Sequence, residues 1–324
     1  MGLVRYIAGR LLWGAVVLVA VSFFSFLVIQ LPPGDYLTSY MEQLQKAGMS
    51  VDDATMAALR HSYGLDRPFL VQYWSWFSRF MQGDMGVSFL YSRKVSAVIL
   101  ERLPATLLIM TSAFVLMYLI SIPLGVYAAR RQYSVGDFTI AILGFLGMAT
   151  PGFLLALVLM WLGYVWFGVS LGGLYSPQFL PQAMSWAKFW DLLKHLPIPI
   201  FVITVAGIAN LVRTMRGTLL DELGQQYVVT ARAKGLAERR LVWRYPVRGA
   251  LNPIIASGGW LLAELFSGET VTSIVLGLPT LGPVLYRALL SEDMFLAASC
   301  VMVMSTLTII GFLISDIVLA IVDP

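Results

Sequence analysis

Six long apolar runs, separated by more polar connections, dominate the pattern along this chain. A helix needs about 20 apolar residues to cross the hydrocarbon core of a bilayer, and each run reaches that length. The expected membrane helices cover residues 9–31, 104–129, 138–167, 196–216, 250–272 and 296–321. We therefore predict an all-α membrane protein with six transmembrane helices.

The first apolar run also has the charge pattern of a secretory signal, since Arg5 and Arg10 precede it. The run from Leu11 to Leu31 is nevertheless long enough to span a bilayer, and PPG at 32–34 follows it without a small-x-small cleavage pattern. We therefore expect this segment to be retained as a membrane helix.

Basic residues are distributed unevenly between the two sides of the predicted protein. An amino terminus inside the cell puts twelve of the 22 Lys and Arg residues in cytoplasmic segments: Arg5, Arg10, Arg130, Arg131, Arg213, Arg216, Arg232, Lys234, Arg239, Arg240, Arg244 and Arg248. Seven of the other ten lie in the long segment 32–103, and long segments cross membranes largely regardless of charge. The pattern predicts that both termini are cytoplasmic.

Three regions follow from this topology. Residues 1–31 form the cytoplasmic amino terminus and first helix, residues 32–103 a small extracytoplasmic cap, and residues 104–324 a five-helix core with a cytoplasmic loop at 217–249. The cap is polar at first and then rich in aromatic residues, which favour the membrane interface. We expect a helix over Phe69–Met81 on the outer leaflet, although a linker with incidental aromatic residues is the alternative.

Another outer loop, at 170–195, ends in SWAKFWDLLKH, which is a second short amphipathic candidate.

The most informative polar segment is Gln226–Pro253, which places six basic residues between two apolar runs. A possible helix from Asp221 to Ala233 stops at Gly235, the residue type that most readily adopts a left-handed helix end. A second short helix is expected to begin near Glu238. This order indicates a folded cytoplasmic element that serves as a docking surface.

The second short helix of this loop has two distinct faces. Arg240 and Arg244 fall one turn apart on one face, and Leu236 and Trp243 fall together on another. One face is suited to a charged partner and the other to an apolar one.

Composition supports a membrane protein and excludes other classes. The 324-residue chain is 58% hydrophobic and 12% charged, with a mean hydropathy of +0.78, which is far more apolar than a soluble domain of this length. The net charge is +4, but the basic residues lie beside apolar spans and form no nucleic-acid-binding signature. We therefore expect no nucleic-acid partner. The single cysteine, Cys300, permits no internal disulfide and is assigned to packing.

The sequence lacks the common motifs of nucleotide-binding and metal-dependent enzymes. The chain has no G-x-x-x-x-G-K-[ST] phosphate loop, no dinucleotide fingerprint after a strand and no H-E-x-x-H motif. His61 and His195 lie in outer segments and are interpreted as solvated or interfacial. We predict no catalytic residue, no metal site and no cofactor in this chain.

Ionisable residues within apolar spans are costly, so each is a functional candidate. Glu264 fits two roles equally, as part of a polar translocation pathway or as a pairing group for a neighbouring subunit. Glu269 lies five residues later and therefore on a different face of a regular helix. Asp316 lies near the inner end of its span, where a structural role is favoured over a substrate role.

A proline interrupts the third predicted span. Pro151 removes a backbone hydrogen bond and is expected to kink the helix, which serves gating or packing equally well. The candidate pathway residues are Met148, Thr150, Pro151, Asn210, Glu264 and Glu269.

Several motifs together resemble a known family. They are PPGD at 32–35, YGLDRPFLVQYWSW at 63–76, ERLPATL at 101–107, IPLGV at 122–126, TARAKGLAERRLVWRYPVRGALNP at 230–253 and GETVTSIVLGLPTLGPVLYRALLSEDMFLAAS at 268–299. The chain closely resembles the B-type permease subunits of bacterial ATP-binding-cassette importers of the dipeptide, oligopeptide and nickel group. The resemblance covers nearly the whole chain and implies a location in the bacterial cytoplasmic (inner) membrane.

The resemblance implies a coupling helix that sits in a cleft of an ATPase subunit. The corresponding residues are Ala231, Arg232, Lys234, Gly235, Leu236, Glu238, Arg239 and Arg240. The wider importer pattern has Glu-Ala-Ala before the glycine, whereas this chain has Val229, Thr230 and Ala231. The glutamate of the carboxy-terminal family motif corresponds to Glu269, and Glu264 has no counterpart in that motif.

The implied assembly is a heterodimer with a second permease, two ATPase subunits that bind ATP and Mg, and an extracytoplasmic substrate-binding protein. The cap and the segment Leu278 to Leu285 are the candidate contacts for the binding protein. Alternating access driven by ATP hydrolysis would move a small oligomeric solute, with peptides favoured and oligosaccharides or nickel left open. An ion-coupled secondary transporter that uses Glu264, Glu269 and Asp316 as a relay is the alternative from another class, followed by an assembly protein.

Overall fold

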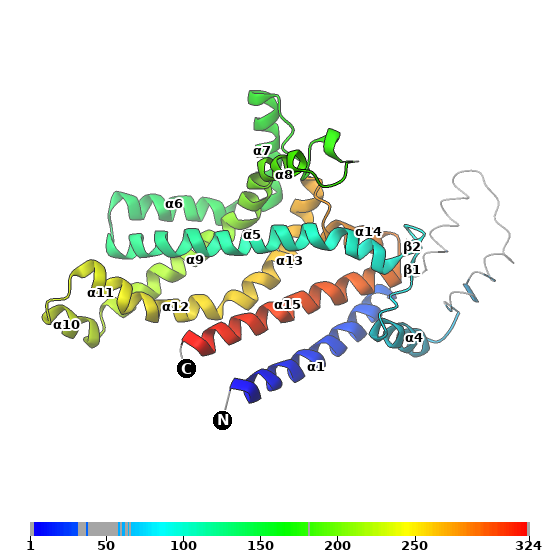
Figure 1. Cartoon of the computed structure of the whole chain (residues 1–324), viewed down its shortest axis with the longest axis horizontal. Coiled ribbons are helices and arrows are strands. Elements are labelled where there is room, and N and C mark those ends of the chain that lie inside the picture. The colour runs from blue at the N-terminus through cyan, green and yellow to red at the C-terminus, as the bar shows by residue number, and fades with distance from the viewer. Residues whose placement is uncertain are drawn as a thin grey trace. The chain divides into compact units, whose positions relative to one another are not determined.

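A computed structural model describes residues 3–31, 37, 58, 60, 61, 64, 66–180 and 182–322, except for the side chains of 3, 4 and 267–269. The described elements are α1 (Leu3–Ile29), α4 (Phe69–Met81), β1 (Val87–Ser88), β2 (Arg93–Lys94), α5 (Val95–Arg130), α6 (Val135–Ala149), α7 (Gly152–Phe167), η1 (Pro177–Phe179), α8 (Trp186–His195), α9 (Pro197–Leu223), α10 (Gln226–Ala233), α11 (Glu238–Arg244), α12 (Pro246–Ala256), α13 (Gly258–Val275), α14 (Leu281–Leu290) and α15 (Met294–Val322) (Figure 1). The predicted all-α architecture is confirmed apart from the short strand pair.

The chain forms two compact units. The core unit comprises Leu107–Pro279 with Ile310–Pro324, and the flanking unit comprises Gly2–Thr106 with Thr280–Ile309. The helices α5 and α15 each contribute residues to both units.

Four stretches of helix are long and apolar enough to cross a membrane: Arg5–Ile29, Val95–Arg130, Trp186–Leu223 and Met294–Val322. They match the predicted first, second, fourth and sixth spans. Their length and composition make this a multi-pass membrane protein.

The third predicted span, 138–167, is not a continuous helix. It is divided into α6 and α7, which are bent by 101° at a short break. Pro151 explains the break, because it has no backbone N–H and it disfavours a helical conformation at the residue before it. Thr150 accordingly takes an extended conformation with φ −92° and ψ 117°. The kink expected at Pro151 is therefore confirmed as a sharp turn. The helices α6 and α7 add a fifth membrane span only if the two are counted as one span.

The fifth predicted span, 250–272, is also divided. The helix α12 ends at Ala256 and α13 begins at Gly258, with Ser257 between them. Pro253 lies inside α12 and two glycines begin α13, and both residue types weaken a helix interior. A count of six continuous transmembrane helices is thus not confirmed by the described residues.

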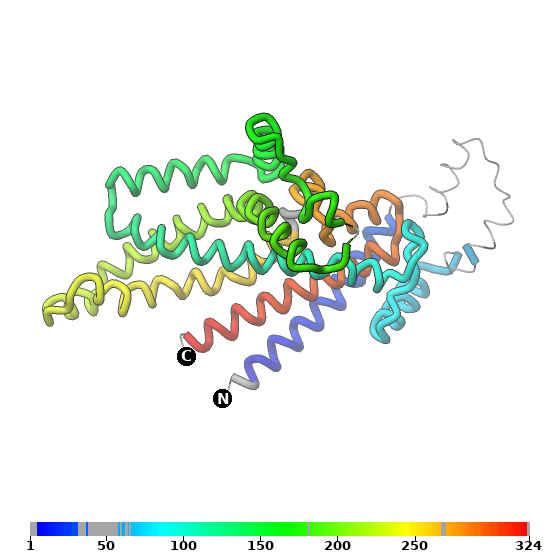
Figure 2. The backbone as a smooth tube through the Cα atoms, turned by 45° about the horizontal axis from the view of Figure 1, so that its top comes forward, coloured from blue at the N-terminus to red at the C-terminus, as the bar shows by residue number. Residues whose placement is uncertain are grey.

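The helix α9 is the centre of the core unit, where it packs against α6, α7, α8, α12 and α13. Figure 2 shows α6 and α12 running alongside it. Close packing of α9 on α5 depends on a small residue at Gly125, because a Cβ there would lie 2.6 Å from Met215 Cβ and 3.2 Å from Val212 O. Glycine at a helix crossing lets the two backbones approach closely, as is usual for membrane helices.

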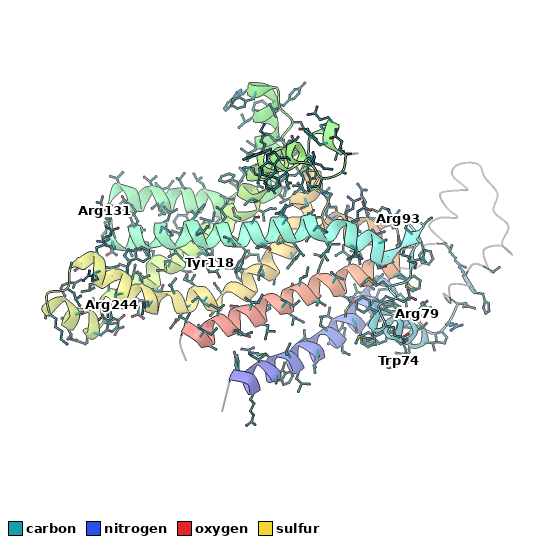
Figure 3. All side chains as sticks on the ribbon, in the orientation of Figure 1. Trp74, Arg79, Arg93, Tyr118, Arg131 and Arg244 are labelled. Carbon is teal, nitrogen blue, oxygen red and sulfur yellow. The ribbon has the colours of Figure 1, made fainter. Side chains whose placement is uncertain are left out.

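An aromatic cluster holds the flanking unit together. Phe26 of α1 stacks on Trp76 of α4, with ring centroids 5.4 Å apart, and the hydroxyls of Ser22 and Tyr73 lie 2.9 Å apart. The helix α4 has the predicted bounds, and the side chain of Trp74, labelled in Figure 3, is 66% exposed. The position of this helix on the outer leaflet stays a prediction.

A buried carboxylate connects the strand pair to the start of α15. Asp293 is fully buried, and its Oδ2 accepts hydrogen bonds from Ser88 Oγ at 2.6 Å and from the backbone N–H of Leu90 at 3.0 Å. Its Oδ1 accepts from the N–H of Leu296 at 3.2 Å and so caps α15. One side chain therefore fixes two segments that are distant in sequence.

We expect Asp293→Ala to lower the free energy of unfolding of the flanking unit by about 2 kcal/mol, because three donors lose their acceptor and the bonds from Ser88 and Leu296 are buried. Thermal denaturation in detergent micelles measures the effect. Asp293→Asn retains a carbonyl acceptor and should recover part of the loss. Equal melting temperatures for the wild type and the Ala variant would contradict this assignment.

Candidate functional site

The predicted docking loop lies between α9 and α12 in the core unit. Figure 1 shows α10 and α11 projecting as a hairpin beyond the ends of these two helices. Arg244 on this hairpin and Arg131 after α5 lie at the same end of the core unit (Figure 3). Basic residues from separate segments thus gather at one end, as expected for a cytoplasmic surface.

The turn between α10 and α11 has the left-handed geometry expected of Gly235. Its φ is +78°, its N–H donates to Arg232 O at 3.0 Å, and the N–H of Leu236 donates to Ala231 O at 3.4 Å. These two bonds form a Schellman motif, which ends a helix through a left-handed residue. A Cβ at Gly235 would have no neighbour within 4 Å. Glycine is therefore required by the backbone conformation and not by lack of space.

The helix predicted over 221–233 is interrupted. The helix α9 ends at Leu223, Gln225 is extended, and α10 begins at Gln226. The hydroxyl of Tyr227 donates to the carboxylate of Glu222 across this break. Partial burial, followed by this bond to a carboxylate, raises the pKa of Tyr227 to about 12. The helical pattern of the sequence predicted neither this break nor the hydrogen bond between Tyr227 and Glu222.

Buried apolar residues hold the two short helices in place. They are Val228 and Ala231 on α10 and Leu241 and Val242 on α11. Trp243 is 46% exposed, so the apolar face that was expected around it remains available for contact.

An ion pair bridges the Gly235 turn. Arg232 Nη2 lies 2.8 Å from Glu238 Oε1, and Arg232 Nε donates to Glu238 Oε2 at 3.1 Å. The hydrogen bonds from Arg232 are the main reason why the pKa of Glu238 is lowered, and the charge of Arg130 adds to this. Sequence reasoning selected both residues of the pair as contacts but not as partners, since no helical spacing relates them.

We expect the Arg232–Glu238 pair to stabilise the turn only weakly, because both side chains are half exposed and solvent screens their attraction. The folded-state pKa of Glu238 lies below its ordinary value of 4.5. The stabilisation of the turn by this pair is therefore fully present above pH 4.5. It is lost as the pH falls through the lower, folded-state pKa of Glu238.

Amide hydrogen exchange at Gly235 and Leu236, corrected for the intrinsic rates, measures this pH dependence. Glu238→Gln should remove it. The same pH dependence in wild type and variant would contradict this role for the pair.

A second ion pair lies where α6 meets α9. Arg216 Nε and Nη2 each donate to a carboxylate oxygen of Asp137 at 2.8 Å. The side chain of Asp137 is 6% exposed, and it also accepts from the backbone N–H of Tyr133 at 2.9 Å. Sequence reasoning counted Arg216 only as a cytoplasmic charge and did not select Asp137. The pair borders an apolar groove of about 410 Å³.

The structure brings together two of the predicted pathway residues. Thr150 and Glu264 line one cavity of about 310 Å³ in the core unit. Met148 lines the separate groove of about 410 Å³. Asn210 accepts a hydrogen bond from Arg213 Nη2 at 3.3 Å, and the side chain of Glu269 lies outside the described residues.

The histidines differ from each other. His61 is exposed and lies 2.7 Å from Asp66 Oδ2, as expected for a solvated residue. The side chain of His195 is only 15% exposed and its Nδ1 lies 2.8 Å from Asp191 O, which does not agree with a solvated residue, and the interfacial alternative stays a prediction. Cys300 is fully buried, in agreement with a packing role. Within the described part of the chain, no group of three or more His, Cys, Asp or Glu residues is placed to hold a metal ion.

Residues 121–324 match the family described as the binding-protein-dependent transport system inner membrane component, and residues 3–111 match the amino-terminal region of such components. The chain belongs to this family. The family resemblance stated from the sequence motifs is therefore confirmed.

Individual relatives of this permease align over almost their full length. The chain is 33% identical to the oligopeptide transport system permease protein AppB of Bacillus subtilis, over 98% of each chain. It is 32% identical to a putative peptide permease protein of Brucella ovis, over 99% of this chain and 98% of the relative. It is 29% identical to the oligopeptide transport system permease protein OppB of Mycobacterium bovis, with the same coverage.

Family membership defines the role of the chain at a coarse level. It is a multi-pass inner-membrane permease subunit of an ATP-binding-cassette importer, and ATP hydrolysis belongs to a separate subunit. Such a permease works together with another permease, an ATPase and a binding protein.

Proposed function

We propose that this chain is one of two related permease subunits that form the pathway of an ATP-driven importer for peptides. The supporting observation is its similarity, over almost the full length, to permeases named for oligopeptide transport. Oligosaccharides and nickel, which are the alternative cargoes, have no support among the relatives described above.

The α10–α11 hairpin is the proposed contact surface for the ATPase subunits. Its proposed contact residues are Ala231, Arg232, Lys234, Gly235, Leu236, Glu238, Arg239 and Arg240. Arg239, Arg240 and Trp243 are exposed beside the Gly235 turn, so the hairpin offers both charge and apolar area to a partner. A rigid turn is suited to transmit force, since burial on α10 and α11 holds both helices to the core unit.

In the full assembly, two ATPase subunits bind ATP and Mg, and this chain holds no cofactor. Both termini and the α10–α11 hairpin face the cytoplasm. The cap and the segment Leu278 to Leu285 contact the extracytoplasmic binding protein. Glu264 and Thr150 line the pathway, which opens to each side in turn as ATP is hydrolysed.

Transport by the purified complex in proteoliposomes tests this proposal. Uptake of a peptide bound to the cognate binding protein should require ATP and should survive collapse of ion gradients. Uptake that depends on an ion gradient and continues without ATP would instead support a secondary transporter. Mass spectrometry of ligands extracted from the binding protein identifies the cargo, and a sugar or nickel in place of peptides would contradict the peptide assignment.

A further inference from the structure

The cavity beside the α6–α7 break is built from four separate helical segments. Thr150 and Gly152 contribute from the break, Glu264 and Thr272 from α13, Val202 from α9 and Met117 from α5. The break packs closely on α13, because a Cβ at Gly152 would lie 3.1 Å from Thr272 Oγ1. The cavity of about 310 Å³ therefore lies where the chain departs from regular helix.

One ionisable side chain faces this space. Among the described residues that line the cavity, Glu264 is the one with an ionisable side chain, and the hydroxyls of Thr150 and Thr272 are the other polar groups. A carboxylate within an apolar helix is costly unless it faces a cavity, a partner or a cargo. Glu264 is exposed in α13 and faces the cavity, so the cavity can accommodate its carboxylate.

The helix ends at the break do not reverse the sign of this charge. The carboxyl end of α6 at Thr150 carries partial negative charge, and the amino end of α7 at Gly152 carries partial positive charge. Because these partial charges have opposite signs and lie beside each other, they offset in part. The carboxylate of Glu264 then determines the sign of the field in the cavity.

We infer that Glu264 makes this cavity a transit site for positively charged groups of the cargo, such as the ammonium group of a peptide or of a lysine side chain. The ammonium group would be attracted by the carboxylate and could donate hydrogen bonds to the Thr150 and Thr272 hydroxyls. A carboxylate on the cargo would be repelled at the same place. This inference rests on the proposed peptide transport and adds a charge preference that belongs to the permease itself.

The test uses the complete reconstituted complex and three tetrapeptides that differ only at the third position, which is lysine, norleucine or glutamate. Uptake is compared between the wild type, Glu264→Gln, Glu264→Met and Glu264→Asp. Because the same binding protein delivers every cargo, its selectivity cancels when each variant is compared with the wild type. Glu101→Gln is the matched control, since Glu101 is 47% exposed and does not line the cavity.

We expect both neutral variants to lower the ratio of lysine-peptide uptake to glutamate-peptide uptake about tenfold, because the attraction and the repulsion are both lost. Norleucine-peptide uptake should change little, and Glu264→Asp and Glu101→Gln should retain the wild-type ratio. Glu264→Met keeps the experiment decisive if the Gln variant does not accumulate.

Two results would overturn the inference. An unchanged ratio in the neutral variants would mean that the cavity does not sense cargo charge. Equal loss for all three peptides, together with loss of the second permease on purification, would mean that Glu264 pairs with the neighbouring subunit. Failure of the proposed function is distinguishable, because the wild-type complex itself would then take up none of the three peptides.

Discussion

Replacing Gly235 with valine is expected to abolish ATP-driven uptake while leaving membrane insertion intact. The φ of +78° at this position costs a residue with a side chain about 1 to 3 kcal/mol, with β-branched residues at the upper end. The Schellman bonds of Gly235 and Leu236 would be lost and α11 would change direction relative to α10. Peptide uptake and ATPase activity stimulated by the loaded binding protein measure the effect.

Two control variants separate the backbone effect from the effect of added bulk. Gly217→Val adds the same side chain within α9, where a Cβ has no neighbour within 4 Å and φ is not positive. Gly235→Asn introduces a residue that tolerates the left-handed region. Both variants should retain most of the uptake. Unchanged uptake and unchanged stimulated ATPase activity in Gly235→Val would show that the coupling assignment is wrong.

Breaking the Asp137–Arg216 pair is expected to have the largest effect on stability. Asp137→Ala leaves the Arg216 guanidinium, whose side chain is 29% exposed, without its bidentate partner, which typically costs about 1.5 to 3 kcal/mol. The backbone N–H of Tyr133 also loses its acceptor. Thermal denaturation of the purified subunit in detergent should show a clear decrease in melting temperature.

A double-mutant cycle tests whether this loss comes from the pair. The double variant Asp137→Ala with Arg216→Ala should be less destabilised than the sum of the two single variants, because neither charge is then left alone. Arg213→Ala, one turn from Arg216 and exposed, should change the melting temperature little. Simple additivity of the two single effects would contradict a direct coupling.

Local signals in the sequence predicted several elements correctly. The bounds of α4 agree with the aromatic, amphipathic pattern of Phe69–Met81, and the left-handed end at Gly235 agrees with the glycine between two helical runs. Pro151 correctly indicated an irregularity within an apolar run. These features depend on residues close together in sequence, where propensity and capping rules apply.

Features that depend on distant residues could not be predicted in this way. Hydropathy reports that a run is apolar but not its direction. The 101° size of the bend at Pro151 and the separation of α12 from α13 were therefore not predicted. Asp137 and Arg216 are 79 residues apart, and Asp293 is 205 residues from Ser88. Only tertiary packing brings these partners together, and a single sequence carries no record of it.

The cytoplasmic position of the α10–α11 hairpin is the claim on which the proposed coupling depends. It is tested most directly with Ala237→Cys in a Cys300→Ser background, labelled with a membrane-impermeant maleimide. Ala237 is exposed beside the Gly235 turn, so its thiol should react. With the hairpin on the cytoplasmic side, we expect labelling in inside-out vesicles stripped of the ATPase subunits, protection when these subunits are present, and no labelling in intact cells, as this position requires. Labelling from the outer side of intact cells would contradict it.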